Sequence, residues 1–176
     1  MNILALCGSL RKQSLNAAVL RTAAELCAPP HEVRIAPSLG RLPFFEQDVE
    51  EAGVLPPAVA ELRERAGAAD GVLIATPEYA RGTSGVLQNA LEWLVGGGQP
   101  YARPVALVSA SPSALGGDRA QAWLRETLTM MGADVLPEGL PIPRAAAKVT
   151  DGRLVDGPAR KELADLLRQL HERPAG

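Results

Sequence analysis

The sequence predicts an α/β fold in which a five-stranded parallel sheet lies between two layers of helices. Three uninterrupted apolar runs, at residues 2–7, 71–75 and 104–110, are typical of strands buried on both faces. Segments with helical spacing of apolar residues separate these runs, as expected when crossover helices join parallel strands. Five strands in this arrangement fit the order 2-1-3-4-5 of a doubly wound, three-layer α/β/α sandwich.

The other elements follow from the same patterns. Residues 32–36 alternate apolar and polar side chains, which indicates a strand at the sheet edge, and residues 134–136 supply a short last strand. The predicted helices span residues 15–26, 57–67, 84–94, 120–131 and 158–170. Residues 96–98 are predicted to form a flexible linker, residues 137–143 to be irregular, and Asp151 and Gly152 to make a turn.

The loop between the first strand and the first helix carries a group of short polar side chains. Ser14 is placed to cap the helix, so the loop lies where free backbone N–H groups and the positive end of the helix dipole point outward. Ser9 and Asn16 add hydrogen-bond donors, and Arg11 adds a forked cation. Together these groups suit a terminal phosphate. The alternative is an ordinary polar turn with a capping serine.

The predicted topology strengthens the phosphate interpretation. The loop has neither the G-x-G-x-x-G pattern of a dinucleotide turn nor the G-K-S/T of a nucleoside-triphosphate loop. In the flavodoxin-like strand order, however, the carboxyl ends of strands 1, 3 and 4 share one edge of the sheet. The loops that follow these strands, at residues 8–16, 76–85 and 109–117, therefore converge on one predicted ligand site.

The segment 37–56 is too long to be a simple connection. It contains both phenylalanines of the chain, Phe44 and Phe45. Two roles are open: a lid or interface piece over an active site, or a pin that fixes the loop to the core. The paired carboxylates Glu50 and Glu51 are interpreted as solvated.

The helix at 84–94 presents apolar residues over an arc wider than one core-facing stripe. One stripe is already made by Leu87, Ala90, Leu91 and Leu94. Val86 and Trp93 are therefore predicted to extend into a second buried surface between copies of the chain, since soluble monomers avoid such an exposed patch. We expect a homodimer or a homotetramer. The alternative is that Trp93 tucks under the 96–98 linker within one chain.

Composition narrows the class of protein. The 176 residues fit one domain, 1–176, and a net charge of −2 without a basic stripe argues against a nucleic-acid partner. No stretch has the length and hydropathy of a membrane span and no basic leader precedes the first strand, so we expect a cytoplasmic protein. Cys7 and Cys27 predict neither a disulfide framework nor a metal site, and His31 and His171 are expected at the surface.

Four motifs are spread in order over the chain up to Pro137. They are Gly8-Ser9-Leu10-Arg11-x-x-Ser14-x-Asn16, Thr76-Pro77-Glu78-Tyr79, Gly85-Val86-Leu87-x-Asn89-Ala90-Leu91-Glu92-Trp93-Leu94, and Ser109-x-Ser111-Pro112 through Gly116-Gly117-x-Arg119-Ala120-Gln121. In these residues the chain resembles the NAD(P)H-dependent FMN reductase family, which also contains quinone, chromate and azo-dye reductases.

The resemblance implies FMN as the cofactor and NADPH or NADH as the electron donor. It implies that the first loop holds the FMN phosphate, that Pro77, Glu78 and Tyr79 line the isoalloxazine ring, and that the loop after the strand at 104–110 closes the far side. The predicted cofactor-binding residues are Ser9, Arg11, Ser14, Leu15, Asn16, Pro77, Glu78, Tyr79, Ala80, Arg81, Gly82, Ser109 and Gly116.

The chain departs from the family pattern after Tyr79. Ala80 stands where the family usually has asparagine, and Arg81-Gly82-Thr83-Ser84 replaces a Gly-Ser-Ile-Pro type of run. Gln88 replaces a frequent lysine. Arg81 is interpreted either as a group near the flavin or nicotinamide phosphate or as a solvated surface charge. The departures predict looser flavin binding or a different acceptor.

The predicted function is an FMN-dependent NAD(P)H oxidoreductase. Hydride passes from nicotinamide to flavin N5 and on to a small acceptor: a quinone, free flavin, azo compound or metal oxyanion. No general acid or base is predicted, because the protein stacks, orients and tunes the cofactor. Two alternatives are a one-electron carrier of the flavodoxin type, which is usually more acidic, and a flavin-poor, non-catalytic descendant of the fold.

Overall fold

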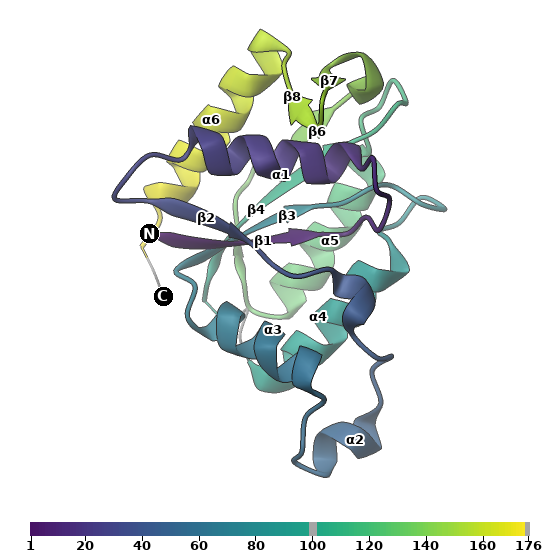
Figure 1. Ribbon diagram of the computed structural model, residues 1–176. Coiled ribbons are helices and arrows are strands. Elements are labelled where there is room, and N and C mark those ends of the chain that lie inside the picture. The colour runs from purple at the N-terminus through teal and green to yellow at the C-terminus, as the bar shows by residue number, and fades with distance from the viewer. Residues whose placement is uncertain (99–101, 175–176) are drawn as a thin grey trace.

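The computed structural model describes residues 1–98 and 102–174 of the chain. A parallel sheet with the order β2-β1-β3-β4-β5 lies at its centre (Figure 1). The strands are β1 (Asn2–Cys7), β2 (Glu32–Ile35), β3 (Gly71–Ala75), β4 (Pro104–Ala110) and β5 (Asp134–Val135). The flavodoxin-like order and the edge position of the second strand are both confirmed.

Helices cover both faces of the sheet, because successive side chains of a strand point to opposite faces. Ile3 and Ala5 of β1 share a core with α1 (Leu15–Leu26) and α6 (Gly157–His171). Leu4 and Leu6 of the same strand share a second core with the helices of the opposite face. These are α3 (Pro57–Gly67), α4 (Gly85–Gly97) and α5 (Asp118–Met130). Figure 1 shows the two helix layers on opposite sides of the sheet.

The predicted cap of the first helix is observed, and a second serine caps α4. The hydroxyls of Ser14 and Ser84 accept hydrogen bonds from the backbone N–H groups of Ala17 at 3.1 Å and Leu87 at 3.4 Å. These bonds satisfy donors that the first turn of a helix leaves free. Both caps stand at the sheet edge to which the ligand loops were assigned, so they fix where α1 and α4 begin.

The glycines at the end of α4 belong to the helix. The helix continues to Gly97, and Gly98 ends it with a left-handed backbone, φ 68°. The prediction of a flexible linker at 96–98 is therefore wrong for its first two residues. Gly96 has a packing role, because a Cβ at this position would overlap the carboxylate of Glu50.

Glu50 lies in α2 (Gln47–Glu51), and the prediction that it is solvated is wrong. Its carboxylate pairs with the guanidinium of Arg63, and its side chain is only 21% exposed. Arg63 also donates to the carbonyl of Trp93, from Nε at 2.8 Å and from Nη2 at 2.6 Å. This chain of contacts ties α2 to α3 and α4.

Trp93 is fully buried within one chain, so the prediction that it lies in a subunit contact is wrong. Its ring stands edge-on to Phe45 with centroids 5.0 Å apart, and its indole N–H donates to the carbonyl of Pro43 at 2.9 Å. The amide of Asn89 holds the same loop, accepting from Phe45 N at 2.7 Å and donating to Pro43 O at 2.8 Å. The loop at 37–56, and not the glycine segment, covers the tryptophan.

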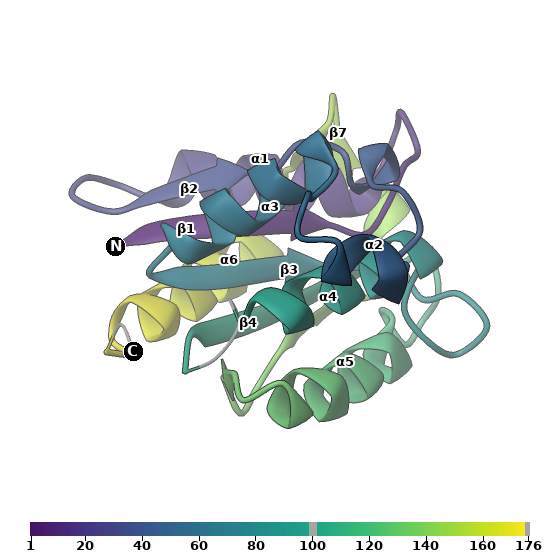
Figure 2. The same ribbon diagram turned by 90° about the horizontal axis from the view of Figure 1, so that it is seen from below.

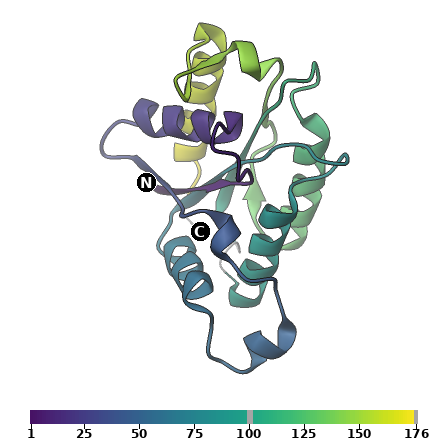
Figure 3. The same cartoon turned by 45° about the vertical axis from the view of Figure 1, so that its right-hand side comes forward.

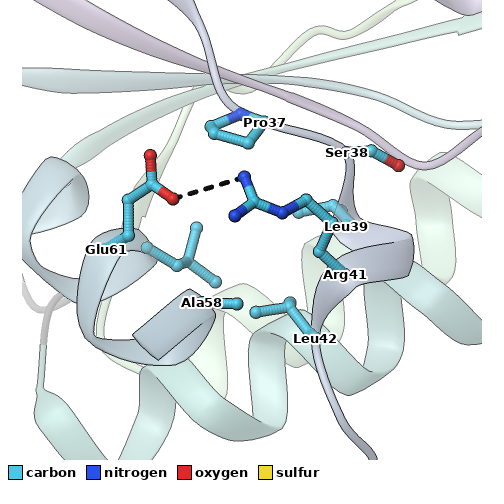
Figure 4. A pocket seen from close by; sticks show the side chains of 8 residues that line it. Pro37, Ser38, Leu39, Arg41, Leu42, Ala58 and Glu61 are labelled. Carbon is cyan, nitrogen blue, oxygen red and sulfur yellow. Dashed lines mark hydrogen bonds and ion pairs between the residues drawn. The ribbon is translucent and has the colours of Figure 1, made fainter. Parts of the chain in front are cut away.

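The same loop is anchored at its start by η1 (Leu39–Arg41). Figure 4 shows Arg41 reaching towards Glu61 of α3, across a small hollow bordered by Leu42 and Ala58. The Arg41 Nη1 to Glu61 Oε2 distance is 3.5 Å. In the view from below of Figure 2, α2 lies in the foreground. The loop is thus held at both ends, while Phe44 between the anchors is 89% exposed.

Three short strands after β5 were not predicted. β6 (Leu140–Ile142) pairs in parallel with the last three residues of β4. The prediction that residues 137–143 are irregular is therefore wrong over this strand. Pro141 lies in its middle and is exposed, which a strand pairing on one side tolerates because proline has no N–H to donate.

A short hairpin follows β6. After η2 (Ala145–Ala147), β7 (Val149–Thr150) and β8 (Arg153–Leu154) pair antiparallel, joined by the predicted turn at Asp151 and Gly152. Both turn residues have left-handed backbones, φ 48° and 70°. Among the described helices, none has the length and hydropathy to cross a membrane.

Candidate cofactor site

The three predicted loops meet at the carboxyl edge of the sheet. They follow β1, β3 and β4, which are neighbours in the sheet. Figure 3 shows the loop between β3 and α4 projecting beyond the sheet edge. Gly8 allows the first loop to pass close to the second, because a Cβ there would lie 2.9 Å from the hydroxyl oxygen of Ser84.

The first loop ends on the N-terminus of α1. Ser14 is buried with its hydroxyl turned to the helix backbone, while Arg11 is exposed. The backbone N–H groups of Leu15 and Asn16 lie in the first helical turn and have no acceptor inside the helix. With the half-buried hydroxyl of Ser9, the loop therefore offers neutral donors and a cation together.

The side chain of Asn16 is bound to the end of β4. Its amide oxygen accepts from Ala110 N at 2.9 Å, and its amide nitrogen donates to Ala110 O at 3.1 Å. The side chain is almost completely buried. Asn16 therefore faces the site through its backbone N–H, while its amide fixes the start of α1 against the sheet.

Charged side chains of the first loop face a cavity of about 600 Å³. Arg11 and Lys12 line it together with Arg21 of α1 and Asp151 of the hairpin. Lys12 and Arg21 were not among the predicted site residues. Lys12 carried a signal, since it stands inside the polar loop, whereas nothing in the sequence linked Arg21 to the hairpin.

A second cavity, of about 720 Å³, adjoins the same loop and is largely apolar. Its apolar wall includes Leu10, Leu39, Leu42, Phe44, Tyr79 and Val86. Arg11 borders both cavities, so the charged and the apolar spaces are neighbours. Tyr79, the aromatic residue predicted to contact the ligand, is 51% exposed.

The loop after β3 forms a tight two-residue turn. Tyr79 and Gly82 exchange backbone hydrogen bonds at 3.0 and 2.9 Å, and Ala80 and Arg81 between them have φ values of 49° and 63°. Turns with two positive φ values favour Asn-Gly, so Ala and Arg are strained there. Arg81 is exposed at the tip of this turn.

The loop after β4 is held in place by hydrogen bonds and by a close backbone contact. The hydroxyl of Ser109 is fully buried and accepts from Gln121 Nε2 at 2.6 Å. The carboxylate of Glu78 accepts the backbone N–H of Arg119 at 3.2 Å. Gly116 is also buried, and a Cβ there would lie 2.9 Å from the backbone nitrogen of Pro143. These contacts fix the position of the loop, and they engage the side chains of Ser109 and Glu78 in hydrogen bonds within the protein.

Cys7 lies at the base of the first loop as a free thiol. Burial raises the pKa of the Cys7 thiol, against smaller opposing effects of Ser9, Ser14 and Arg21. Its Sγ donates to the carbonyl of Ser9 at 3.6 Å. The thiol therefore stays protonated at neutral pH and supports the loop without acting as a nucleophile.

Known proteins resemble this chain in sequence. The family model described as NADPH-dependent FMN reductase matches residues 1–147. The chain belongs to this family. A relative named NAD(P)H-dependent FMN reductase from Pseudomonas aeruginosa is 37% identical over 174 residues, which cover 97% of this chain and 93% of the relative. A quinone reductase from Escherichia coli strain K12 is 38% identical over 138 residues, 77% of this chain and 73% of that enzyme.

A solved structure agrees with the sequence comparisons. The flavoenzyme NAD(P)H:(acceptor) oxidoreductase FerB from Paracoccus denitrificans is 29% identical and superposes with a TM-score of 0.84, covering 96% of this chain and 94% of that one. As a member of the family, the chain is an NAD(P)H-dependent flavin oxidoreductase with FMN as its cofactor.

The residues of the site fit this cofactor. A flavin mononucleotide carries a dianion at one end and a flat, largely apolar ring at the other. The first loop brings cations and backbone N–H groups to one cavity and borders an apolar cavity that contains an aromatic side chain. Arg11, which lines both cavities, lies where the two ends of such a ligand would join.

Proposed function

We propose that this enzyme transfers hydride from NADPH or NADH to FMN and passes the electrons to a small quinone-type acceptor. The observation that supports the proposal is the pair of adjoining cavities, one charged and one apolar, on either side of the β1–α1 loop. When bound, FMN supplies the redox chemistry, because its ring accepts hydride at N5 and delivers electrons onward. The names of the relatives, quinone reductase among them, support the acceptor class.

Binding of the phosphate is assigned to the first loop. Arg11 supplies a charge-assisted contact, the hydroxyls of Ser9 and Ser14 are close by, and Leu15 and Asn16 contribute backbone N–H groups at the positive end of α1. The Ser14 hydroxyl accepts a hydrogen bond from the helix backbone, and it would keep this capping role while it contacts the phosphate. Lys12 adds charge at the rim of the same cavity.

The ring is assigned to the apolar cavity beside the second loop. Tyr79 lines this cavity, whereas Pro77 and Glu78 precede it in the same loop and would reach the ring from outside the lining. The turn from Ala80 to Gly82 would lie at the open side with Arg81 at the tip. Ser109 and Gly116 would close the far side through the backbone of their loop. Backbone N–H groups need no particular side chain, so the replacement of the usual asparagine by Ala80 is compatible with this role.

The test of the proposed function is an anaerobic stopped-flow experiment. Protein loaded with FMN is mixed with NADPH or NADH, and the visible flavin absorbance is followed. Rapid bleaching to the two-electron reduced form, followed by rapid reoxidation with a quinone, is expected. A protein that binds FMN but bleaches no faster than free FMN with NADPH would instead be a one-electron carrier, and a protein that does not retain FMN would be a non-catalytic descendant.

We also propose that the working unit is a homodimer or a homotetramer, now on different residues from those first predicted. Phe44 is 89% exposed, Leu10 is 55% exposed and Tyr79 is 51% exposed, and all three line the apolar cavity. Exposed apolar surface around a cavity is typical of an interface. Sedimentation equilibrium tests the proposal: a single species of monomer mass at micromolar concentration would refute it.

A further inference from the structure

Arg21 is a cation that the predicted site did not include. It lies in the second turn of α1, and its Nε donates to the carbonyl of Gly152 at 2.9 Å, a bond between residues 131 positions apart. Arg21 lines the same cavity as Arg11 and Lys12. The side chain is half-buried, so its position is restricted more than that of the exposed cations of the loop.

The charges around this cavity are unbalanced. Its lining includes the three cations Arg11, Lys12 and Arg21 but a single carboxylate, Asp151. Within the described part of the chain, none of the three cations takes part in an ion pair. Like charges that face one space repel each other, so an anion that enters this space is stabilised by all of them.

The hairpin of β7 and β8 holds Arg21 in place. Gly152 has φ 70°, and a Cβ there would lie 2.9 Å from Arg21 Nη2, so glycine leaves room for the guanidinium. The hairpin is fixed along α1 by two further contacts. The backbone N–H of Leu154 donates to Thr22 Oγ1 at 2.9 Å, and Arg153 pairs with Glu25. Of these contacts, only the one at Arg21 and Gly152 borders the cavity.

We propose that Arg21 is a second guanidinium ligand of the FMN phosphate, placed for this task by the β7–β8 hairpin. The inference rests on the proposed function, because it assumes that the phosphate occupies the charged cavity. Arginine suits the role because its fork keeps spare donors after Nε has bonded to Gly152. The hairpin lies after residue 147, where the family match ends, so this chain would use a segment beyond the matched region to hold its cofactor.

The test compares FMN with riboflavin, which has the same ring but no phosphate. Dissociation constants of both flavins are measured by fluorescence titration for the wild type and for Arg21→Gln. Loss of a charge-assisted contact is expected to weaken FMN binding about 10- to 100-fold and to leave riboflavin binding unchanged. Arg168→Gln is the matched control, since it removes an exposed arginine of α6 whose partners are Asp165 and Glu172, and it should change neither constant.

Gly152→Ala approaches the contact from the hairpin side and keeps the arginine. The added methyl group should displace the guanidinium and lower the ratio of FMN to riboflavin affinity, even if Arg21→Gln proves too unstable to titrate. An unchanged ratio of FMN to riboflavin affinity in Arg21→Gln would overturn the role of Arg21. If Arg21→Gln is too unstable to titrate, an unchanged ratio in Gly152→Ala would overturn it. A wild-type protein that binds both flavins equally would overturn the phosphate site itself and the inference with it.

Discussion

The amide of Asn16 offers a sharp test of how the site is built. It makes two hydrogen bonds to the backbone of Ala110, at 2.9 and 3.1 Å, across 94 positions of sequence. Asn16→Ala removes both partners and leaves a buried N–H and a buried carbonyl of Ala110 unsatisfied. We expect α1 to lose its attachment to the end of β4 and the folded state to become less stable.

The size of the effect follows from the burial of these groups. Asn16 is 3% exposed and Ala110 is also 3% exposed, so water does not readily replace the lost bonds. Leaving buried donors and acceptors unpaired costs about 1–3 kcal/mol for each group, so the substitution should cost about 2–6 kcal/mol in total. For a chain of this size, that corresponds to a fall in Tm of roughly 4–24 °C.

Thermal and chemical unfolding of Asn16→Ala and of Gln13→Ala provide the assay. Gln13 is an exposed neighbour in the same loop, so its substitution should leave Tm within about 1 °C of the wild type. A loss of less than about 0.5 kcal/mol in Asn16→Ala would refute the view that the amide joins α1 to the sheet.

Asn16→Asp adds a pH dependence to the same test. An aspartate can accept from Ala110 N, but its ionised form faces the carbonyl of Ala110 without a proton to donate. The folded-state pKa of the new carboxyl should therefore rise above its unfolded value of about 3.9. The stability deficit of this variant should shrink as pH falls from 7 towards 5, because the protonated form restores the donor. A deficit that stays constant over this range would contradict the geometry.

Four further predictions concern separate parts of the molecule. Arg11→Ala should weaken FMN binding by about 2–4 kcal/mol, roughly 30- to 900-fold, without a matching change in riboflavin affinity or in Tm. Trp93→Ala should cost about 3–5 kcal/mol in unfolding experiments, since the ring is fully buried within the chain, and a loss under 1 kcal/mol would contradict this placement. Phe44→Ser should leave the stability of the monomer unchanged but shift the sedimentation profile towards smaller species. Burial, then the nearby His31 stacked at 4.0 Å and the N-terminal amine, lower the pKa of His171, so stability should fall as pH drops below about 6.5 and His171→Gln should reduce that slope.

The local sequence determined the elements that build the sheet edge. The apolar runs at 2–7, 71–75 and 104–110 became β1, β3 and β4, because a strand covered on both faces needs apolar side chains in both directions. Ser14 marked the start of α1, since capping depends only on residues within one turn. Together with the predicted order of the strands, these local signals predict that the three loops lie at one edge of the sheet.

Other features depended on contacts between distant segments. Glu50 was interpreted as solvated because a carboxylate in a loop usually is, but Arg63 of α3 pairs with it. The sequence does not predict β6, because three residues with a proline in the middle show no strand periodicity. Only the pairing with β4 defines this segment as a strand.

Trp93 shows the same division within a single residue. The apolar spacing correctly predicts its place on a helix but does not predict which segment covers it. The covering residues Pro43 and Phe45 belong to a loop about 50 positions earlier in the chain. Arg21 and Gly152 meet across 131 positions, and neither carries a local signal of the other. Periodicity and caps depend on residues a few positions apart, so they can be predicted from the sequence. The partners of the Trp93 ring and of the Arg21 guanidinium come from distant segments, so only the tertiary structure determines them.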